Sequence, residues 1–321
     1  MSLEAWALAA GELETVTVRE PTVREPKVRE PIVRERIVNW RGCDGNLLVG
    51  EAFGDESGPP VLLLHGGGQT RHAWGGTGKA LADAGFYAVS LDMRGHGQSD
   101  WVADGNYRVG AYADDLRAVV PNFASPPAVV GASLGGMAGL LAQGEHPGPL
   151  LSALVLVDVA HRLERTGVDR VLSFMTGHLE GFATLEEAAD AIAAYMPHRK
   201  RPRDLGGLAK NLRLGADGRY RWHWDPAFLD PRVRRTQDDL PERLEASARS
   251  LKIPTLLVRG RLSDVMSQEV ADEFRALAPA TRLVDVKAAA HMVAGDKNDI
   301  FTDAVVGFLR EVSRNQSTTI A

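Results

Sequence analysis

The sequence predicts an α/β fold in which a mostly parallel sheet is flanked by helices. Apolar runs at residues 60–64, 128–130 and 153–157 have the unbroken hydrophobic pattern of strands that are buried on both faces. Helix-like segments separate these runs, and such alternation is typical of parallel strands joined by right-handed crossovers. With 321 residues and 44% hydrophobic content, the chain is long enough for one large core with an inserted subdomain.

The N-terminal segment has a different composition. Residues 18–37 carry a five-residue repeat that begins Val-Arg-Glu and places prolines at Pro21, Pro26 and Pro31. Proline every fifth residue excludes both a continuous helix and a central strand. We therefore expect residues 1–36 to form an extended, repeat-containing arm, and a role in partner binding stays open.

The core elements follow in chain order. Residues 37–40 and 47–53 flank a turn that contains Cys43, and this pattern predicts an antiparallel hairpin. The last helix carries an apolar stripe that begins at Ile300. Between the hairpin and this helix we expect strands at 60–64, 86–91, 128–130, 153–157, 254–258 and 283–286, with helices at 76–84 and 111–120 and a further helix before the last strand.

The strand pattern stops in the middle of the chain, where helix-like segments replace it. Thr184 and Glu187 form a capping-box pattern that opens one of these helices, and Pro197 closes it. We predict a helical cap at 162–249. The predicted core then comprises residues 37–161 and 250–314, and residues 315–321 form a flexible polar tail.

Composition excludes several functional classes. A formal net charge of −5 argues against a nucleic-acid partner, because phosphate binding requires a basic surface. The single cysteine, Cys43, excludes an internal disulfide and a multi-cysteine metal site. No apolar segment approaches the roughly 20 residues that cross a bilayer, and no signal-peptide pattern is present. We expect a cytoplasmic protein with a small-molecule substrate, and the sequence leaves homo-oligomerisation open.

A short motif around Ser133 provides the candidate nucleophile. The apolar run that ends at Val130 leads into Gly131-Ala132-Ser133-Leu134-Gly135, a Gly-x-Ser-x-Gly sequence that predicts a strand, a tight corner and a helix. The small residues give the corner room to lift Ser133, and the helix start directs N–H groups and the positive end of its dipole toward the same place. The alternative is a glycine-rich turn with a capping serine, and the motif alone does not decide between them.

A serine nucleophile needs a base and a carboxylate that orients the base. In open α/β sheets the catalytic groups lie beyond the carboxyl ends of the strands. Asp264 and His291 each follow a predicted strand, so Ser133, Asp264 and His291 occur in the order nucleophile, acid, base. Asp158, directly after the strand at 153–157, is the competing acid. We favour Asp264 because the typical acid lies in the later loop.

The loop at residues 65–68 reads His-Gly-Gly-Gly and follows the first buried strand. A tetrahedral intermediate carries a negative oxygen that requires N–H donors, and glycines allow the backbone to approach it. We expect the N–H groups of Gly67 and Leu134 to form the oxyanion hole. His65 is expected to be structural, and so is the turn at residues 92–99.

Five short sequences together resemble the α/β-hydrolase family: His-Gly-Gly-Gly at 65–68, Asp-Met-Arg-Gly-His-Gly-Gln-Ser at 92–99, Gly-Ala-Ser-Leu-Gly-Gly at 131–136, Ser-Asp at 263–264 and Ala-His-Met at 290–292. The resemblance covers residues 37–313. It implies an eight-stranded, mostly parallel sheet, a helical cap inserted after the sixth strand, and a Ser-His-Asp triad that needs no cofactor. We also expect no metal site. Ala290 stands where many relatives have glycine.

Ser133 argues against the branches of this family that use a carboxylate nucleophile, namely the epoxide and haloalkane hydrolases. It favours hydrolysis of a carboxylic ester or lactone of a small to medium, partly apolar substrate. Cofactor-free haloperoxidase or perhydrolase chemistry and C–C bond hydrolysis use the same triad and stay open, as does a non-catalytic binding protein with this fold. The residues expected to line the substrate pocket are Trp74, Met292, Tyr195, Trp222 and Trp224. Met196, Tyr220 and Phe228 are further apolar residues of the predicted cap.

Overall fold

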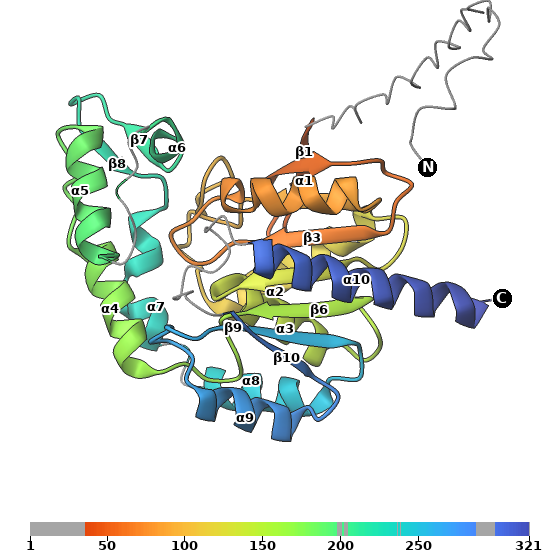
Figure 1. The fold of residues 1–321 in the computed structure, drawn as a ribbon. Helices are drawn as coiled ribbons and strands as arrows, with labels where there is room; N and C mark the ends of the chain where they lie inside the picture. Colours follow the sequence, from red (N-terminus) through yellow and green to blue (C-terminus); the bar gives the residue numbers. More distant parts are fainter. Residues whose placement is uncertain are drawn as a thin grey trace, which may run out of the picture. The chain divides into compact units, whose positions relative to one another are not determined.

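The computed structural model describes residues 36–197, 201, 205–235, 237, 239–286 and 299–320. Within this part of the chain, eight strands form one sheet in the order β1-β2-β4-β3-β5-β6-β9-β10 (Figure 1). Their bounds are β1 Arg36–Arg41, β2 Leu47–Phe53, β3 Pro60–Leu64, β4 Tyr87–Leu91, β5 Ala128–Ala132, β6 Ala153–Val157, β9 Thr255–Gly260 and β10 Arg282–Val286. The predicted α/β fold and its eight-stranded sheet are confirmed.

The sheet is antiparallel only at the edge that carries the N-terminal hairpin. β1 pairs with β2, and β2 pairs with β4, in antiparallel register, whereas the pairings from β4 to β10 are parallel. The predicted hairpin is thus present, and Cys43 lies exposed in its turn. Of the predicted arm only Arg36 is described, as the first residue of β1, and residues 1–35 lie outside the described residues.

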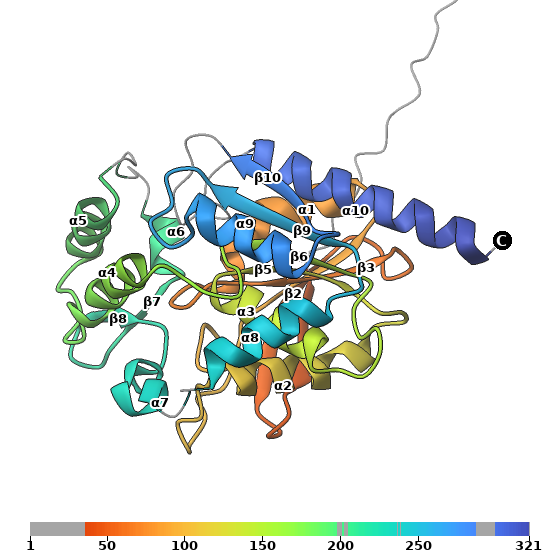
Figure 2. The same ribbon diagram turned by 90° about the horizontal axis from the view of Figure 1, so that it is seen from below.

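Helices cover both faces of the sheet, as Figure 2 shows. Helices α1 (Gly75–Asp83) and α10 (Asp299–Ile320) lie on one face. On the other face lie α2 (Val109–Val119), α3 (Leu134–Gly144), α8 (Leu240–Ser250) and α9 (Gln268–Leu277). The side chains of β3 alternate between the two faces of the sheet. Val61 and Leu63 belong to the apolar cluster with α1 and α10, whereas Leu62 and Leu64 belong to the cluster with the other helices.

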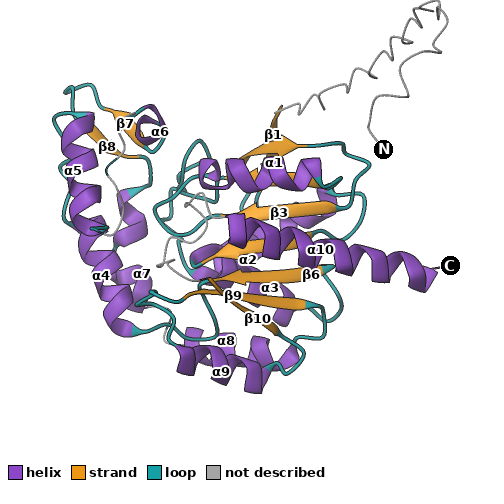
Figure 3. Cartoon of the chain, viewed as in Figure 1, coloured by secondary structure: helices purple, strands orange, loops and turns teal. Residues whose placement is uncertain are grey.

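The segment between β6 and α8 stands at the carboxyl edge of the sheet (Figure 3). Its helices and strands lie within the range predicted as a helical cap, and we refer to the segment as the cap. Its elements are α4 Arg165–Thr176, α5 Leu185–Tyr195, α6 Gly206–Ala209, β7 Leu212–Leu214, β8 Tyr220–Trp222, the 3-10 helix η3 Pro226–Leu229 and α7 Pro231–Arg235. The cap has a small apolar core of its own, in which Phe182 and Trp222 are buried. The capping-box threonine, Thr184, accepts a hydrogen bond from the N–H of Glu187 at 3.1 Å.

Helix α8 lies inside the predicted cap range but belongs to the core layer. Its Leu244 and Ala248 are buried in the same cluster as α2 and α3. The backbones also approach closely, since a Cβ on Gly144 would lie 2.3 Å from the Cβ of Ser247. We therefore propose that the cap ends before α8 rather than at residue 249.

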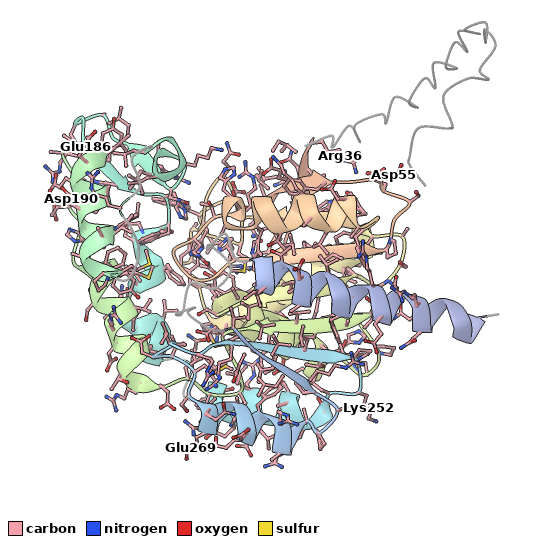
Figure 4. All side chains as sticks on the ribbon, in the orientation of Figure 1. Arg36, Asp55, Glu186, Asp190, Lys252 and Glu269 are labelled. Atoms are coloured by element: carbon pink, nitrogen blue, oxygen red, sulfur yellow. The ribbon has the colours of Figure 1, made fainter. Side chains whose placement is uncertain are left out.

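Charged side chains are distributed over distant parts of the surface. Glu186 and Asp190 project from α5 on the outer side of the cap, Lys252 lies shortly before β9, and Glu269 lies at the start of α9 (Figure 4). Residues 315–320, predicted as a flexible tail, continue helix α10. In the described part of the chain no helix is both long and apolar enough to span a membrane.

Candidate active site

Ser133 lies at the tight corner between β5 and α3. Its φ of 45° and ψ of −112° are strained for a residue that carries a Cβ. The corner is also crowded, because a Cβ on Gly131 would lie 2.5 Å from the backbone of Gly135, and a Cβ on Gly135 would lie 2.6 Å from the backbone oxygen of Leu64. Packing therefore requires both glycines of the motif. A corner of this kind exposes the serine hydroxyl at the carboxyl edge of the sheet.

Two groups of N–H donors flank Ser133. Leu134 is the first residue of α3, and the first N–H groups of a helix have no acceptor within it. The glycine loop lies on the other side: a Cβ on Gly66 would lie 3.5 Å from the Cβ of Ser133, and a Cβ on Gly67 would lie 3.9 Å from the Cδ2 of Leu134. Both predicted oxyanion donors thus belong to segments that adjoin the serine.

His65 anchors this glycine loop. Its imidazole is fully buried, with Nδ1 2.8 Å from the carbonyl oxygen of Gly66, and its Nε2 accepts the N–H of Met93 at 3.0 Å. Burial lowers the pKa of His65 to about 4. His65 is therefore a neutral structural residue, as the sequence analysis expects.

Asp158 occupies the position next to Ser133 on the neighbouring strand. Strands β5 and β6 pair Ala132 with Val157, so Ser133 and Asp158 each follow the last paired residue. Among the described residues other than glycine, Ser133 and Asp158 are the two with positive φ, and the φ of Asp158 is 52°. Backbone strain of this kind persists where the surroundings enforce it and is frequent at active sites.

The carboxylate of Asp158 is held firmly inside the protein. The residue has 0% exposure, its Oδ1 accepts the N–H of Gly260 at 3.1 Å, and its Oδ2 accepts the hydroxyl of Ser263 at 2.5 Å. Both donors come from the loop after β9. A buried carboxylate with fixed donors is suited to orient a base.

Asp264, the acid favoured by the sequence analysis, has different surroundings. Its carboxylate accepts a hydrogen bond from Arg170 of α4 at 2.9 Å, and these two side chains are 39% and 50% exposed. Its backbone oxygen also packs against Gly167, where a Cβ would lie 2.2 Å away. Asp264 therefore connects the loop after β9 to the cap.

The predicted base and one predicted pocket residue, His291 and Met292, lie outside the described residues. The strand that precedes them, β10, pairs its last residue Val286 with Gly260 of β9. Gly260 is also the residue whose N–H binds Asp158. β10 therefore ends at the same carboxyl edge of the sheet as β5 and β6.

The cap contacts the glycine loop through apolar side chains. A Cβ on Gly68 would lie 2.8 Å from the Cε of Met175 and 3.2 Å from the Cζ3 of Trp224, and a Cβ on Gly67 would lie 3.1 Å from the ring of Phe228. Trp224 was expected in the pocket. The apolar cap residues named from the sequence include Phe228 but omit Met175, because a single methionine within α4 carries no signal that separates it from the cap core.

The other pocket residues expected from the sequence lie elsewhere. Trp222 stacks on Trp224 with ring centroids 4.9 Å apart, and Tyr195 stacks on Phe174 at 4.3 Å, so both pack within the cap. Trp74 has 0% exposure and belongs to the apolar cluster between the sheet, α1 and α10. Its indole therefore has no surface that a substrate could touch in this structure.

The fold and the strained serine corner define the class of the protein. The chain belongs to the alpha/beta hydrolase fold family, whose sequence profile matches residues 59–297. It is 31% identical to esterase Rv0045c of Mycobacterium tuberculosis over 262 residues, which cover 79% of this chain and 83% of that protein.

Two solved structures resemble the chain. The M. tuberculosis esterase Rv0045c gives a TM-score of 0.70 at 26% identity, with 88% of this chain and 94% of that chain covered. The crystal structure of E-2-(acetamidomethylene)succinate hydrolase gives a TM-score of 0.74 at 24% identity and covers 86% of this chain and 100% of that one. The latter likeness concerns the fold.

Proposed function

We propose that the chain hydrolyses a carboxylic ester or lactone of a small to medium, partly apolar substrate through an acyl-enzyme intermediate on Ser133. His291 acts as the base, Asp158 orients His291, and the N–H groups of Gly67 and Leu134 bind the oxyanion. Membership of the family and the named esterase among its relatives support ester hydrolysis. The observation that carries the assignment of the nucleophile is the strained backbone of Ser133 at the strand-to-helix corner.

In the first half of the reaction, the Ser133 oxygen attacks the carbonyl carbon while His291 takes the hydroxyl proton. The carbonyl oxygen becomes negative and accepts hydrogen bonds from the two backbone donors. When the C–O bond to the leaving group breaks, His291 returns the proton to the departing alcohol. In the second half, water attacks the acyl-enzyme through the same base, releases the carboxylic acid and restores Ser133.

We propose Asp158 rather than Asp264 as the acid. Asp158 is buried at the strand end next to Ser133, and its two oxygens accept hydrogen bonds from Gly260 and Ser263. Asp264 is partly exposed and paired with Arg170. A carboxylate in solvent contact and bound to a guanidinium orients an imidazole poorly, because the cation competes for the same oxygen.

We propose that Met175, Trp224 and Phe228 form the apolar wall above the glycine loop. Each lies within van der Waals range of the space beside Gly67 or Gly68. Apolar side chains of this kind bind the hydrocarbon part of a substrate and exclude water from the reacting ester. Their close approach to the loop favours acyl groups of modest size.

The replacement Ser133→Ala tests the proposal. We expect the turnover of a short p-nitrophenyl ester to fall on the order of a thousandfold or more, because the acyl-enzyme cannot form. Steady-state kinetics on the purified variant measure this change, and Ser152→Ala serves as a matched control because Ser152 precedes β6 at the opposite edge of the sheet. Wild-type turnover by Ser133→Ala would refute the proposed function.

A further inference from the structure

His96 and His223 lie next to the glycine loop at residues 65–68, and the proposed chemistry uses neither histidine. His65, His96 and His223 form a row, with ring centroids 5.0 Å apart for the first pair and 5.8 Å apart for the second. His96 belongs to the core turn at residues 92–99, and His223 belongs to the cap, directly after β8. The exposed fractions of His96 and His223 are 0% and 2%. Buried histidines in direct contact with a catalytic loop require an explanation.

The two rings hold Gly68 from opposite sides. The N–H of Gly68 donates to Nε2 of His96 at 3.1 Å, and Nε2 of His223 lies 3.3 Å from the carbonyl oxygen of Gly68. Gly68 has a φ of 78°, the left-handed conformation that glycine adopts without strain. The cap and the core thus both bind the backbone of this glycine.

The second nitrogen of each ring fixes which nitrogen carries the proton. Nδ1 of His96 lies 2.9 Å from the carbonyl oxygen of Arg94, so it donates and Nε2 is free to accept. Nδ1 of His223 accepts the N–H of Gly97 at 2.7 Å, so its Nε2 carries the proton and donates to Gly68. Both rings are neutral in this arrangement.

Gly68 directly follows Gly67, the residue whose N–H is proposed to bind the oxyanion. The peptide plane that contains the Gly67 N–H also contains the Gly66 carbonyl, and His65 holds that carbonyl through Nδ1 at 2.8 Å. The next peptide plane contains the Gly68 N–H, which His96 holds. His65 and His96 therefore fix the peptides on both sides of the Gly67 Cα. His223, from the cap, fixes the following peptide through the Gly68 carbonyl, so both peptides of Gly68 are held.

We propose that His96 and His223 are positioning residues that clamp Gly68, so that a cap histidine sets the geometry of the oxyanion hole. This inference rests on the proposed function. It means that the cap contributes to the rate of the chemical step as well as to substrate binding.

Burial and neighbouring groups keep both rings neutral. Burial is the largest cause that lowers the pKa of His96, to about 3, and that of His223. His96, His65 and Arg213 further lower the pKa of His223, and His65 further lowers that of His96. Asp92 and Asp225 act in the opposite direction on His96, but its pKa stays lowered. A protonated ring could not accept the hydrogen bond from Gly68 or from Gly97.

Two amide replacements at residue 223 separate its two hydrogen bonds. In His223→Gln the longer side chain reaches the position of Nε2 and keeps the bond to the Gly68 carbonyl. In His223→Asn the shorter side chain reaches only the position of Nδ1, so it keeps the bond from the Gly97 N–H and loses the bond to Gly68. Both variants retain a polar amide of similar size. Arg213→Ala is the control, because Arg213 also joins the cap to the Gly97 carbonyl, at 2.5 Å.

We expect His223→Asn to lower kcat for a p-nitrophenyl ester by roughly tenfold or more with KM changed little. The displaced N–H donor would weaken its hydrogen bond to the oxyanion, and the oxyanion forms only in the transition state and the tetrahedral intermediate. His223→Gln and Arg213→Ala should stay within about threefold of the wild-type kcat. Inhibition by a boronic acid, which mimics the tetrahedral intermediate on serine, should weaken in His223→Asn by the same factor as kcat.

Equal kcat values for His223→Asn and His223→Gln, whether both high or both low, would overturn the clamp. A drop in kcat that appears equally in Arg213→Ala would also overturn it, because any loss of cap attachment would then suffice. These outcomes differ from failure of the proposed function, in which Ser133→Ala retains turnover. An inactive Ser133→Ala together with an unaffected His223→Asn would remove the clamp alone.

Discussion

The carboxyl ends of β6 and β9 carry aspartates with opposite properties. Asp158 directly follows β6 and has a strained backbone and a fully buried carboxylate. Asp264, four residues after the end of β9, is 39% exposed and paired with Arg170 of the cap. The loop after β9 serves both sites, because Gly260 and Ser263 donate hydrogen bonds to Asp158. One loop thus donates hydrogen bonds to Asp158, the proposed acid, while its own Asp264 pairs with Arg170 of the cap.

The contrast between Asp158 and Asp264 shows a limit of chain order. Chain order identifies the strand ends at which an acid can lie, but it does not decide which of the two carboxylates is suited to orient a base. Two acidic residues at neighbouring strand ends satisfy the same sequence pattern. Burial, backbone strain and donors to both oxygens separate them, and these properties depend on contacts between distant segments. An exposed ion pair of the Asp264 type contributes little to stability, in the range of about 0–1 kcal/mol.

The largest expected effect comes from exchanging each aspartate for the isosteric amide. Asp158→Asn should lower kcat for a p-nitrophenyl ester by roughly a thousandfold or more, because an amide cannot stabilise the imidazolium or hold its tautomer. Asp264→Asn should stay within about fivefold of wild type. Steady-state kinetics on the pair measure both effects. The reverse ranking would return the role to Asp264.

A smaller effect concerns stability and pH. The pKa values of His65 and His96 lie at about 4 and about 3 in the folded protein, below the ordinary value of 6.5, because both rings are buried. Between pH 6.5 and pH 5 the unfolded chain binds more protons than the folded one, so the free energy of unfolding falls as the pH is lowered. Each histidine should contribute roughly 1 kcal/mol per pH unit.

Urea unfolding at pH 7.5, 6.5, 5.5 and 5.0 measures this dependence. A variant at the exposed His146, such as His146→Gln, is the control and should keep the wild-type slope. His96→Gln should have a shallower slope, because a neutral amide replaces a ring that gains a proton on unfolding. An unchanged slope in His96→Gln would contradict the assignment of a neutral buried ring.

The sequence was sufficient for the fold and for the position of Ser133. Unbroken apolar runs identify buried strands, and Gly131 and Gly135 predict the corner because a side chain at either position would collide with backbone. These signals are local. The hairpin, the parallel strands and the family followed from the same kind of pattern.

Features that depend on long-range packing could not be read in this way. Helix α8 lies within the helix-rich range predicted as the cap, and its buried Leu244 and Ala248 and its close approach to α3 at Gly144 assign it to the core layer. Trp74 follows the glycine loop in sequence but is buried between the sheet and α10. His223 is one of several cap histidines, and its bonds to Gly68 and Gly97 join segments more than a hundred residues apart.

The most direct test of the central claim is covalent labelling with a fluorophosphonate, followed by mass spectrometry of the labelled peptide. The account predicts one phosphonate on Ser133, no label in Ser133→Ala, and much slower labelling in Asp158→Asn than in Asp264→Asn. A wild-type protein that stays unlabelled would indicate a binding protein without catalysis. A label on any other residue, or labelling that survives in Ser133→Ala, would contradict the assignment of Ser133 as the nucleophile.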